Sequence, residues 1–261
     1  MPITLLSDLG VYDPAMVALS AQLRTYNPQE EVVAISHDVT PYDLQQAAYI
    51  FSAAYPYFPK GTVHIIVIDV FGGSQPRIIL AEKDGDYFIA PDNGILQFVF
   101  GAEPLSTYVC SESERPYIFG DWIKTVAGLA HRLIKSKDIA GYPVYDVNTT
   151  PTVWKPKELP DGIECNILYV DHFENVTLDL TKQQFFELTK GRPFKIKITR
   201  TMVITTISDN YNDVNGGEPL CRFNAAGFME IALNHGRAAS LLGLGAYHTG
   251  NLQYQTIKIA Y

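Results

Sequence analysis

The chain has 261 residues, which suits one large domain or two modest ones, and 47% of them are hydrophobic, enough for a packed core. Its formal net charge of −8, with acidic and basic residues interleaved, gives no basic patch and argues against a nucleic-acid partner. No stretch is suited to span a membrane, no signal-peptide pattern is visible, and three distant cysteines argue against disulfides, so we expect a cytoplasmic protein.

The first half of the chain alternates short apolar runs with helical patterns. Asp13 is an expected helix N-cap followed by Pro14. A hairpin is expected at the turn Asp84-Gly85-Asp86. The expected strands cover residues 3–7, 31–36 and 63–69, the hairpin covers 77–90, and the helices cover 13–23, 40–54, a stretch after 94, and 122–134. Strands alternating with helices predict an α/β domain with a mainly parallel sheet covered on both faces.

The second half has a different character. Residues 146–162 contain three prolines and no periodicity, and we interpret them as a linker. Beyond them, strand-like runs at 165–170, 175–179, 194–198 and 252–260 predict a smaller all-β domain, a barrel or sandwich. We therefore expect an α/β domain over residues 1–145 and a β domain over residues 163–261.

Polar residues stand where the first three strands are expected to end. They are Asp8, the pair His37-Asp38, and Asp69, which is followed by Gly72-Gly73. Each alone could serve a turn or a helix cap. Because ligands bind outside the carboxyl ends of parallel strands, the three together predict an acidic crevice suited to hydroxyls or a cation. No P-loop or GxGxxG motif accompanies them.

Six sequence blocks, in order, resemble one family. They are SDLG at 7–10, ISHDVTPYD at 35–43, FPKGTVHIIVID at 58–69, APDNG at 90–94, VDHFEN at 170–175 and AGFMEIALNHGRAA at 226–239. On these blocks the chain resembles the S-adenosyl-L-methionine (SAM) hydroxide adenosyltransferases, a family related to the SAM-dependent fluorinase and chlorinase.

The resemblance implies a homotrimer in which SAM binds between the N-terminal domain of one subunit and the C-terminal domain of its neighbour. It implies that Asp8 accepts hydrogen bonds from the ribose hydroxyls. Such hydrogen bonds are strong because the acceptor is charged. The substrate-binding residues carried over from the family are Asp8, Asp13, Tyr42, Asn93, Asp171, Phe173, Asn175 and Asn234. Asn93 and Asn175, taken alone, would be read as turn residues, and Phe228 as a core residue.

The reaction that the resemblance implies is hydrolysis of SAM to adenosine and L-methionine by water or hydroxide attack at C5′, with neither cofactor nor metal. Asp69 and Arg77 are the expected catalytic residues, although the loop before Arg77 is one residue longer than in the family. An aspartate at position 69 argues against halide as the nucleophile. Phe119 stands where the family has a histidine, and Ala225-Ala226 replace a polar pair that helps to hold methionine.

Two hypotheses therefore remain. The chain is a SAM hydrolase with an altered proton path, or a relative that binds SAM or adenosine without efficient turnover. His131, three helical turns beyond Phe119, is read as a structural residue, whereas His172 lies inside the VDHFEN block and is closer to the expected pocket. Metal hydrolases, methyltransferases and serine or cysteine hydrolases fit less well, because their ligand clusters, glycine-rich loops and nucleophile elbows are missing from the sequence.

Overall fold

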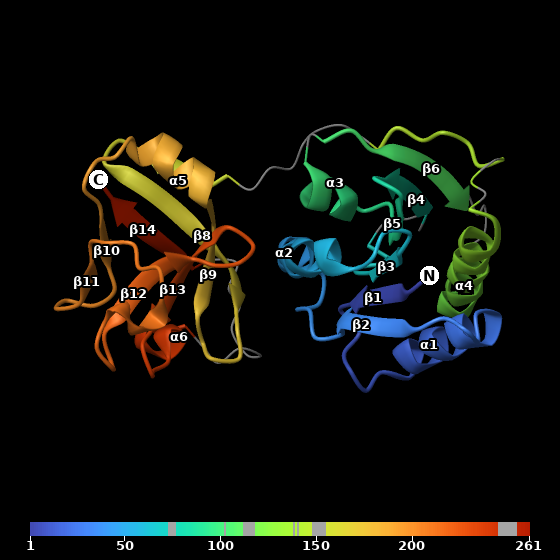
Figure 1. The fold of residues 1–261 in the computed structure, drawn as a ribbon, viewed down its shortest axis with the longest axis horizontal. Coiled ribbons are helices and arrows are strands. Elements are labelled where there is room, and N and C mark those ends of the chain that lie inside the picture. The colour runs from blue at the N-terminus through green and yellow to red at the C-terminus, as the bar shows by residue number, and fades with distance from the viewer. Residues whose placement is uncertain are drawn as a thin grey trace. The chain divides into compact units, whose positions relative to one another are not determined.

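The computed structural model of the protein describes residues 1–72, 77–101, 103–111, 118–137, 139, 141–147, 155–244 and 255–261. The chain forms two compact units, Met1–Val153 and Trp154–Tyr261. Each unit contains its own sheet (Figure 1). Each also has its own buried hydrophobic cluster.

The N-terminal unit contains a six-stranded sheet with the order β2-β1-β3-β5-β4-β6. Its strands are β1 (Ile3–Ser7), β2 (Val32–Ser36), β3 (Val63–Val67), β4 (Ile78–Lys83), β5 (Asp86–Pro91) and β6 (Ser106–Ser111). The neighbours β2, β1, β3 and β5 are parallel, whereas β4 is antiparallel to both β5 and β6. The turn of the β4–β5 hairpin has positive φ at Asp84 and Gly85, as the sequence predicted.

Two pairs of helices cover this sheet, with α1 beside α4 and α2 beside α3 (Figure 1). The helices are α1 (Pro14–Tyr26), α2 (Leu44–Ala54), α3 (Ile95–Phe100) and α4 (Phe119–Ser136), with a 3-10 turn, η1 (Tyr55–Tyr57), after α2. Leu19 and Leu23 of α1 and Trp122 of α4 pack in one core cluster with the strand residues Leu5 and Ile65. The alternation of strand residues therefore buries one row of side chains under each helical layer.

Two local predictions were wrong for identifiable reasons. The sheet was expected to be covered on both faces, but β2, which corresponds to the strand expected at residues 31–36, is its edge strand and is only partly covered. The helix expected from residue 40 begins at Leu44, because Tyr42 has a φ of 66°, which a right-handed helix excludes. Asp43 caps α2 instead, by accepting a hydrogen bond from the Gln46 N–H.

The C-terminal unit contains an eight-stranded sheet with the order β11-β10-β14-β8-β9-β13-β12, and β7 also pairs with β8. Its strands are β7 (Lys157–Leu159), β8 (Gly162–Val170), β9 (Val176–Thr181), β10 (Lys195–Lys197), β11 (Val203–Ile204), β12 (Pro219–Phe223), β13 (Phe228–Leu233) and β14 (Thr256–Ala260). The short helices are α5 (Lys182–Thr189), α6 (Ala238–Leu241) and the 3-10 turn η2 (Tyr211–Asp213). A parallel bridge between Ile207 and Cys221 joins the β12 end of the sheet to the segment after β11, giving a nearly closed barrel.

The predicted fold class, an α/β unit with a mainly parallel sheet followed by a smaller β unit, is confirmed. β7 lies within residues 146–162, the range predicted as a linker. Of the strand predicted over residues 252–260, the described part is β14, and Gly73 lies outside the described residues.

Candidate functional site

A single carboxylate oxygen joins three loops at the carboxyl edge of the parallel strands. Asp8 directly follows β1, and its Oδ2 accepts hydrogen bonds from the backbone N–H of Tyr42 at 3.0 Å and of Asp69 at 3.1 Å. Tyr42 lies between β2 and α2, and Asp69 lies just beyond β3. Both N–H donors belong to residues with a left-handed backbone, with φ of 66° and 44°. Asp8 and Asp69 thus lie close together, as their places at the strand ends predict.

The backbone and side chain of Asp69 are held by two further residues. The Asn93 side-chain amide donates to the carbonyl of Ile68 at 2.8 Å and to that of Asp69 at 3.4 Å. The carboxylate of Asp69 turns back over Gly72, whose own N–H donates to the Asp69 carbonyl at 3.1 Å. Asn93 therefore supports Asp69 from the neighbouring loop, after β5.

The surroundings of the Asp69 carboxylate change its acidity. Among the described residues no hydrogen-bond donor contacts its oxygens. Burial and the negative charge of Asp8 raise the pKa of Asp69. Nearby in the same layer of loops, burial lowers the pKa of His37, whose Nδ1 lies 3.0 Å from Ser7 Oγ. A lowered pKa favours the uncharged form of His37.

Arg77 contacts the side chains of Tyr145 and Asp92. Its Nη1 donates to the Tyr145 hydroxyl at 2.9 Å and lies 3.5 Å from Asp92 Oδ2. The Tyr145 hydroxyl in turn donates to Asp92 at 2.7 Å, and this hydrogen bond, together with burial, raises the pKa of Tyr145. Within the described part of the chain there is no ion pair between Arg77 and Asp69.

Phe119 forms an aromatic stack at the start of α4. Its ring is parallel to that of Trp122 at 5.9 Å and lies edge-on to that of Phe71 at 6.0 Å. Phe71 is only two residues beyond Asp69 and is partly exposed. An apolar ring, which can neither donate nor accept a proton, therefore occupies the position where the family resemblance places a histidine.

Asp13 and Tyr42 have local structural roles alongside their expected contacts with substrate. Asp13 caps α1, as the sequence predicted, by accepting from the Ala15 N–H at 2.7 Å. Tyr42 donates its backbone N–H to Asp8, and the residue is 73% exposed.

The loop after β8 in the C-terminal unit contains Asp171, Phe173 and Asn175, the three substrate-binding candidates of the VDHFEN block. Asp171 Oδ1 accepts from the N–H groups of Phe173 and Asn175 at 2.9 and 2.8 Å, and Oδ2 accepts from the Asn175 amide at 2.9 Å. Glu174 binds Arg237 and Ser240 of the α6 region. These hydrogen bonds connect the loop internally and to the α6 region, and Phe173 within it is 73% exposed.

Asn234, just after β13, has hydrogen-bond partners outside the loop that follows β8. Its side-chain amide donates to the Val214 carbonyl at 2.7 Å, and its backbone N–H donates to the Glu218 carbonyl at 3.1 Å. Asn234 therefore organises the turn before β12.

Two groups escaped the sequence analysis. Asp92 and Tyr145 hold Arg77, and only Asp92 lies in a recognised block. On the C-terminal unit the Tyr211 hydroxyl donates to the buried Glu230 at 2.8 Å, and the Arg222 guanidinium lies 4.7 Å from the Tyr211 ring centre. Burial raises the pKa of Glu230, with a smaller contribution from Asp171. The packing of η2 against β12 and β13 could not be predicted from the sequence.

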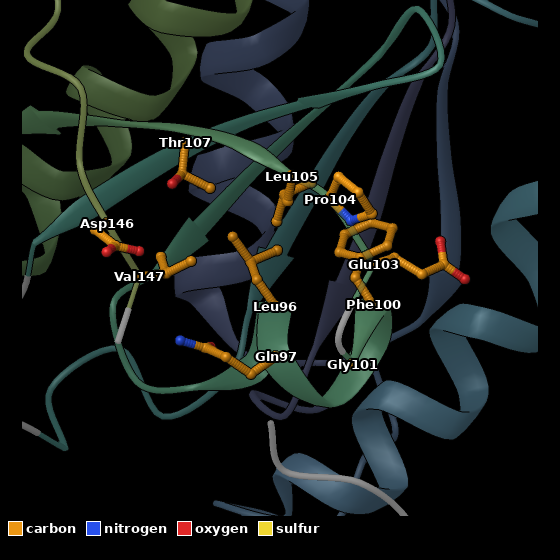
Figure 2. A pocket seen from close by; sticks show the side chains of 10 residues that line it. All are labelled: Leu96, Gln97, Phe100, Gly101, Glu103, Pro104, Leu105, Thr107, Asp146 and Val147. Atoms are coloured by element: carbon orange, nitrogen blue, oxygen red, sulfur yellow. The ribbon is translucent and has the colours of Figure 1, made fainter. Parts of the chain in front are cut away.

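A cavity of about 340 Å³ beside α3 contains none of the predicted site residues (Figure 2). Figure 2 shows an apolar centre, with the carboxylates of Asp146 and Glu103 on opposite sides. Its lining residues are Leu96, Gln97, Phe100, Gly101, Glu103, Pro104, Leu105, Thr107, Asp146 and Val147. In the described ranges no group of three or more His, Cys, Asp or Glu residues is placed to hold a metal, and no helix is long and apolar enough to cross a bilayer.

Comparison with known proteins gives two family matches. A model of the N-terminal domain of SAM hydroxide adenosyltransferases matches residues 3–120, and a model of their C-terminal domain matches residues 165–249. The chain belongs to the SAM hydroxide adenosyltransferase family. All six sequence blocks that resemble this family lie within one or the other of these two matched ranges.

Named relatives of the chain match it over nearly its whole length. A protein named (R)-S-adenosyl-L-methionine hydrolase from Thermus thermophilus is 27% identical over 256 residues, covering 93% of this chain and 96% of its own. One of the same name from Salinispora tropica is 29% identical, with coverages of 93% and 94%. A fluorinase from an Actinoplanes species is 20% identical, with coverages of 89% and 90%.

Solved structures show the same fold. A conserved protein of Thermotoga maritima, described as uncharacterized, superposes with a TM-score of 0.76 at 24% identity, covering 99% of this chain and all of the other. A conserved hypothetical protein of Thermus thermophilus gives a TM-score of 0.70 at 24% identity, with coverages of 99% and 98%.

Proposed function

We propose that the protein hydrolyses SAM to adenosine and L-methionine. Water or hydroxide attacks C5′, and the C5′–sulfur bond breaks as the new C5′–oxygen bond forms. The sulfonium sulfur keeps the electron pair and leaves as the neutral thioether of methionine, so the leaving group needs no acid. The enzyme has to align the nucleophile, exclude solvent and accept one proton.

The observation that carries this proposal is the state of Asp69. Its carboxylate lies at the ligand-binding edge of the sheet, has no hydrogen-bond donor on it among the described residues, and has a raised pKa. A carboxylate with a raised pKa is a better acceptor for the proton of the attacking water. The negative charge of Asp8 and Asp69 also suits a sulfonium cation, and the names of the relatives support the same substrate.

Arg77 belongs to the proposed site as well. Tyr145 and Asp92 hold the Arg77 side chain. From this position we expect Arg77 to contact the substrate rather than Asp69. We propose that Asp8, Asp13, Tyr42 and Asn93 contact the nucleoside side, and that Asp171, Phe173, Asn175 and Asn234 contact adenine and methionine. The resemblance supports a homotrimer, which size-exclusion chromatography with light scattering tests, and the cytoplasmic location stays a prediction.

A second candidate function is favoured by Phe119. Because its stacked ring cannot transfer a proton, a relative that binds SAM or adenosine with little turnover fits the same fold. Missing a general base of ordinary strength would slow hydrolysis by about 10²- to 10⁴-fold, which leaves a measurable enzyme.

The test is incubation of the purified protein with SAM, followed by chromatography of adenosine and methionine. Since the relatives are named for the (R) form, both sulfonium epimers are compared. We expect equal amounts of the two products, and a loss of about 10²-fold or more in Asp69→Asn. Asp84→Asn is the matched control, because Asp84 is also a left-handed aspartate but lies in the exposed β4–β5 turn. Absence of products, with SAM still raising the melting temperature, would establish the binding protein instead.

A further inference from the structure

We propose that Asp8 is a positioning residue for Asp69, in addition to contacting substrate. The two oxygens of its carboxylate have separate environments. Oδ2 accepts both backbone N–H groups, from Tyr42 and from Asp69, whereas no hydrogen bond among the described residues involves Oδ1. Oδ2 therefore organises the loops, and Oδ1 is the oxygen left for a ligand hydroxyl.

The need for such an anchor comes from the backbone of both donors. Tyr42 and Asp69 have φ of 66° and 44°, a region that residues with a Cβ rarely adopt. Such conformations persist only where the surroundings hold them. An ionised acceptor at 3.0 and 3.1 Å holds both at once, because hydrogen bonds to a charged group are stronger than neutral ones.

The conformation of Asp69 sets where its carboxylate lies. The Asp8 oxygen binds the Asp69 N–H, and Asn93 binds the Asp69 carbonyl, so that both sides of this one residue are fixed. Its carboxylate then folds back over Gly72. Loss of the Asp8 acceptor would allow Asp69 to return to negative φ, and its carboxylate would leave this place.

The experiment compares Asp8→Asn with Asp8→Ala in the full chain. The side-chain carbonyl of asparagine can replace Oδ2 as the acceptor of both N–H groups, whereas alanine offers no acceptor. Asp84→Asn and Asp84→Ala are matched controls at another left-handed aspartate. For each variant, kcat and KM are measured with SAM, and the φ of Asp69 is read from a crystal structure.

We expect Asp8→Asn to raise KM and to lower kcat by less than about 10-fold, because it preserves the anchor but changes the ligand-facing atom and removes the negative charge beside Asp69. We expect Asp8→Ala to lower kcat by about 10²-fold in addition, with Asp69 at negative φ. Equal effects of the two variants on KM with kcat unchanged, or a left-handed Asp69 in Asp8→Ala, would overturn the positioning role. The kinetic part rests on the proposed function, whereas the φ of Asp69 decides the positioning role even if the wild-type protein produces no adenosine.

Discussion

The carboxylate of Asp69 lies against the Cα of Gly72 so closely that a Cβ on Gly72 would stand 2.2 Å from Asp69 Oδ2. No side chain fits there without displacing the carboxylate, because real Cβ atoms do not approach an oxygen so closely. Gly72 has no positive φ, so the requirement for glycine comes from space and not from backbone conformation.

Gly72→Ala is expected to lower the rate of adenosine formation by about 10-fold or more, since small displacements of a reacting group are costly. The measurement is kcat at saturating SAM. Gly128→Ala is the matched control, because Gly128 lies inside α4 with no atom within 4 Å of the added Cβ. The control should keep kcat and raise stability by about 0.5–1 kcal/mol. Equal activity of the two variants would show that the position of the Asp69 carboxylate does not matter.

Phe119→His is expected to accelerate hydrolysis by about 10-fold or more, because it supplies an imidazole for proton transfer close to the loop of Asp69. Phe119→Leu is the control, which removes the stack on Trp122 without adding a proton acceptor. The readout is kcat against pH for both variants. A leucine variant as fast as the histidine variant would attribute any gain to loosened packing.

Tyr145→Phe is expected to lower the free energy of unfolding by about 1–3 kcal/mol, because it removes the partner of both Arg77 and Asp92. Thermal or urea unfolding measures this change. Tyr142→Phe is the control, since the Tyr142 ring stacks under Arg132, and its hydroxyl has no hydrogen bond among the described residues. Equal stability of both variants would mean that the Arg77 cluster contributes nothing to folding.

His64 makes stability depend on pH. Burial lowers the pKa of His64 to about 4, and its ring is stacked on Phe88, with Nδ1 2.7 Å from Thr4 Oγ1. In the unfolded chain the pKa of His64 is 6.5, so His64 binds a proton there that it does not bind in the folded protein. The free energy of unfolding therefore falls as the pH drops from 6.5 to about 4. The loss amounts to about 3 kcal/mol.

Unfolding in urea at pH 7 and at pH 4.5 checks this prediction. His64→Gln should lose less stability between the two pH values than the wild type, because glutamine does not titrate. His235→Asn, at an exposed position, serves as the control and should follow the wild type. A His64→Gln slope equal to that of the wild type would exclude His64 as the source.

Most strands and helices of the N-terminal unit could be predicted from local patterns, although β6 was not among them. Residues 3–7 form β1 as expected, and Asp13 and Pro14 mark the start of α1. The hydrophobic periodicity of a sequence does not indicate the sign of the φ angle, however. For this reason the start of α2 at Leu44 was predicted too early. Positive φ at Tyr42 depends on the Asp8 side chain, a contact 34 residues away in sequence.

The site was predictable to the extent that it follows from strand ends. Asp8 and Asp69 meet because parallel strands end at one edge. The partners of Arg77 could not be predicted, because Tyr145 reaches Asp92 only after residues 143–145 fold along β6. Likewise, the Tyr211–Glu230 hydrogen bond depends on how η2 packs against the sheet, which no pattern in the sequence reports.

The course of residues 143–145 has a consequence for behaviour at high concentration. Val109 donates to the Pro143 carbonyl at 3.1 Å and Tyr145 donates to the Thr107 carbonyl at 2.9 Å, so this segment occupies the outer edge of β6. An uncovered edge offers unpaired N–H and C=O groups to a strand of another molecule and promotes aggregation. Variants that release the Tyr145 side chain from Arg77 and Asp92 are therefore expected to uncover this edge and to aggregate more readily during purification.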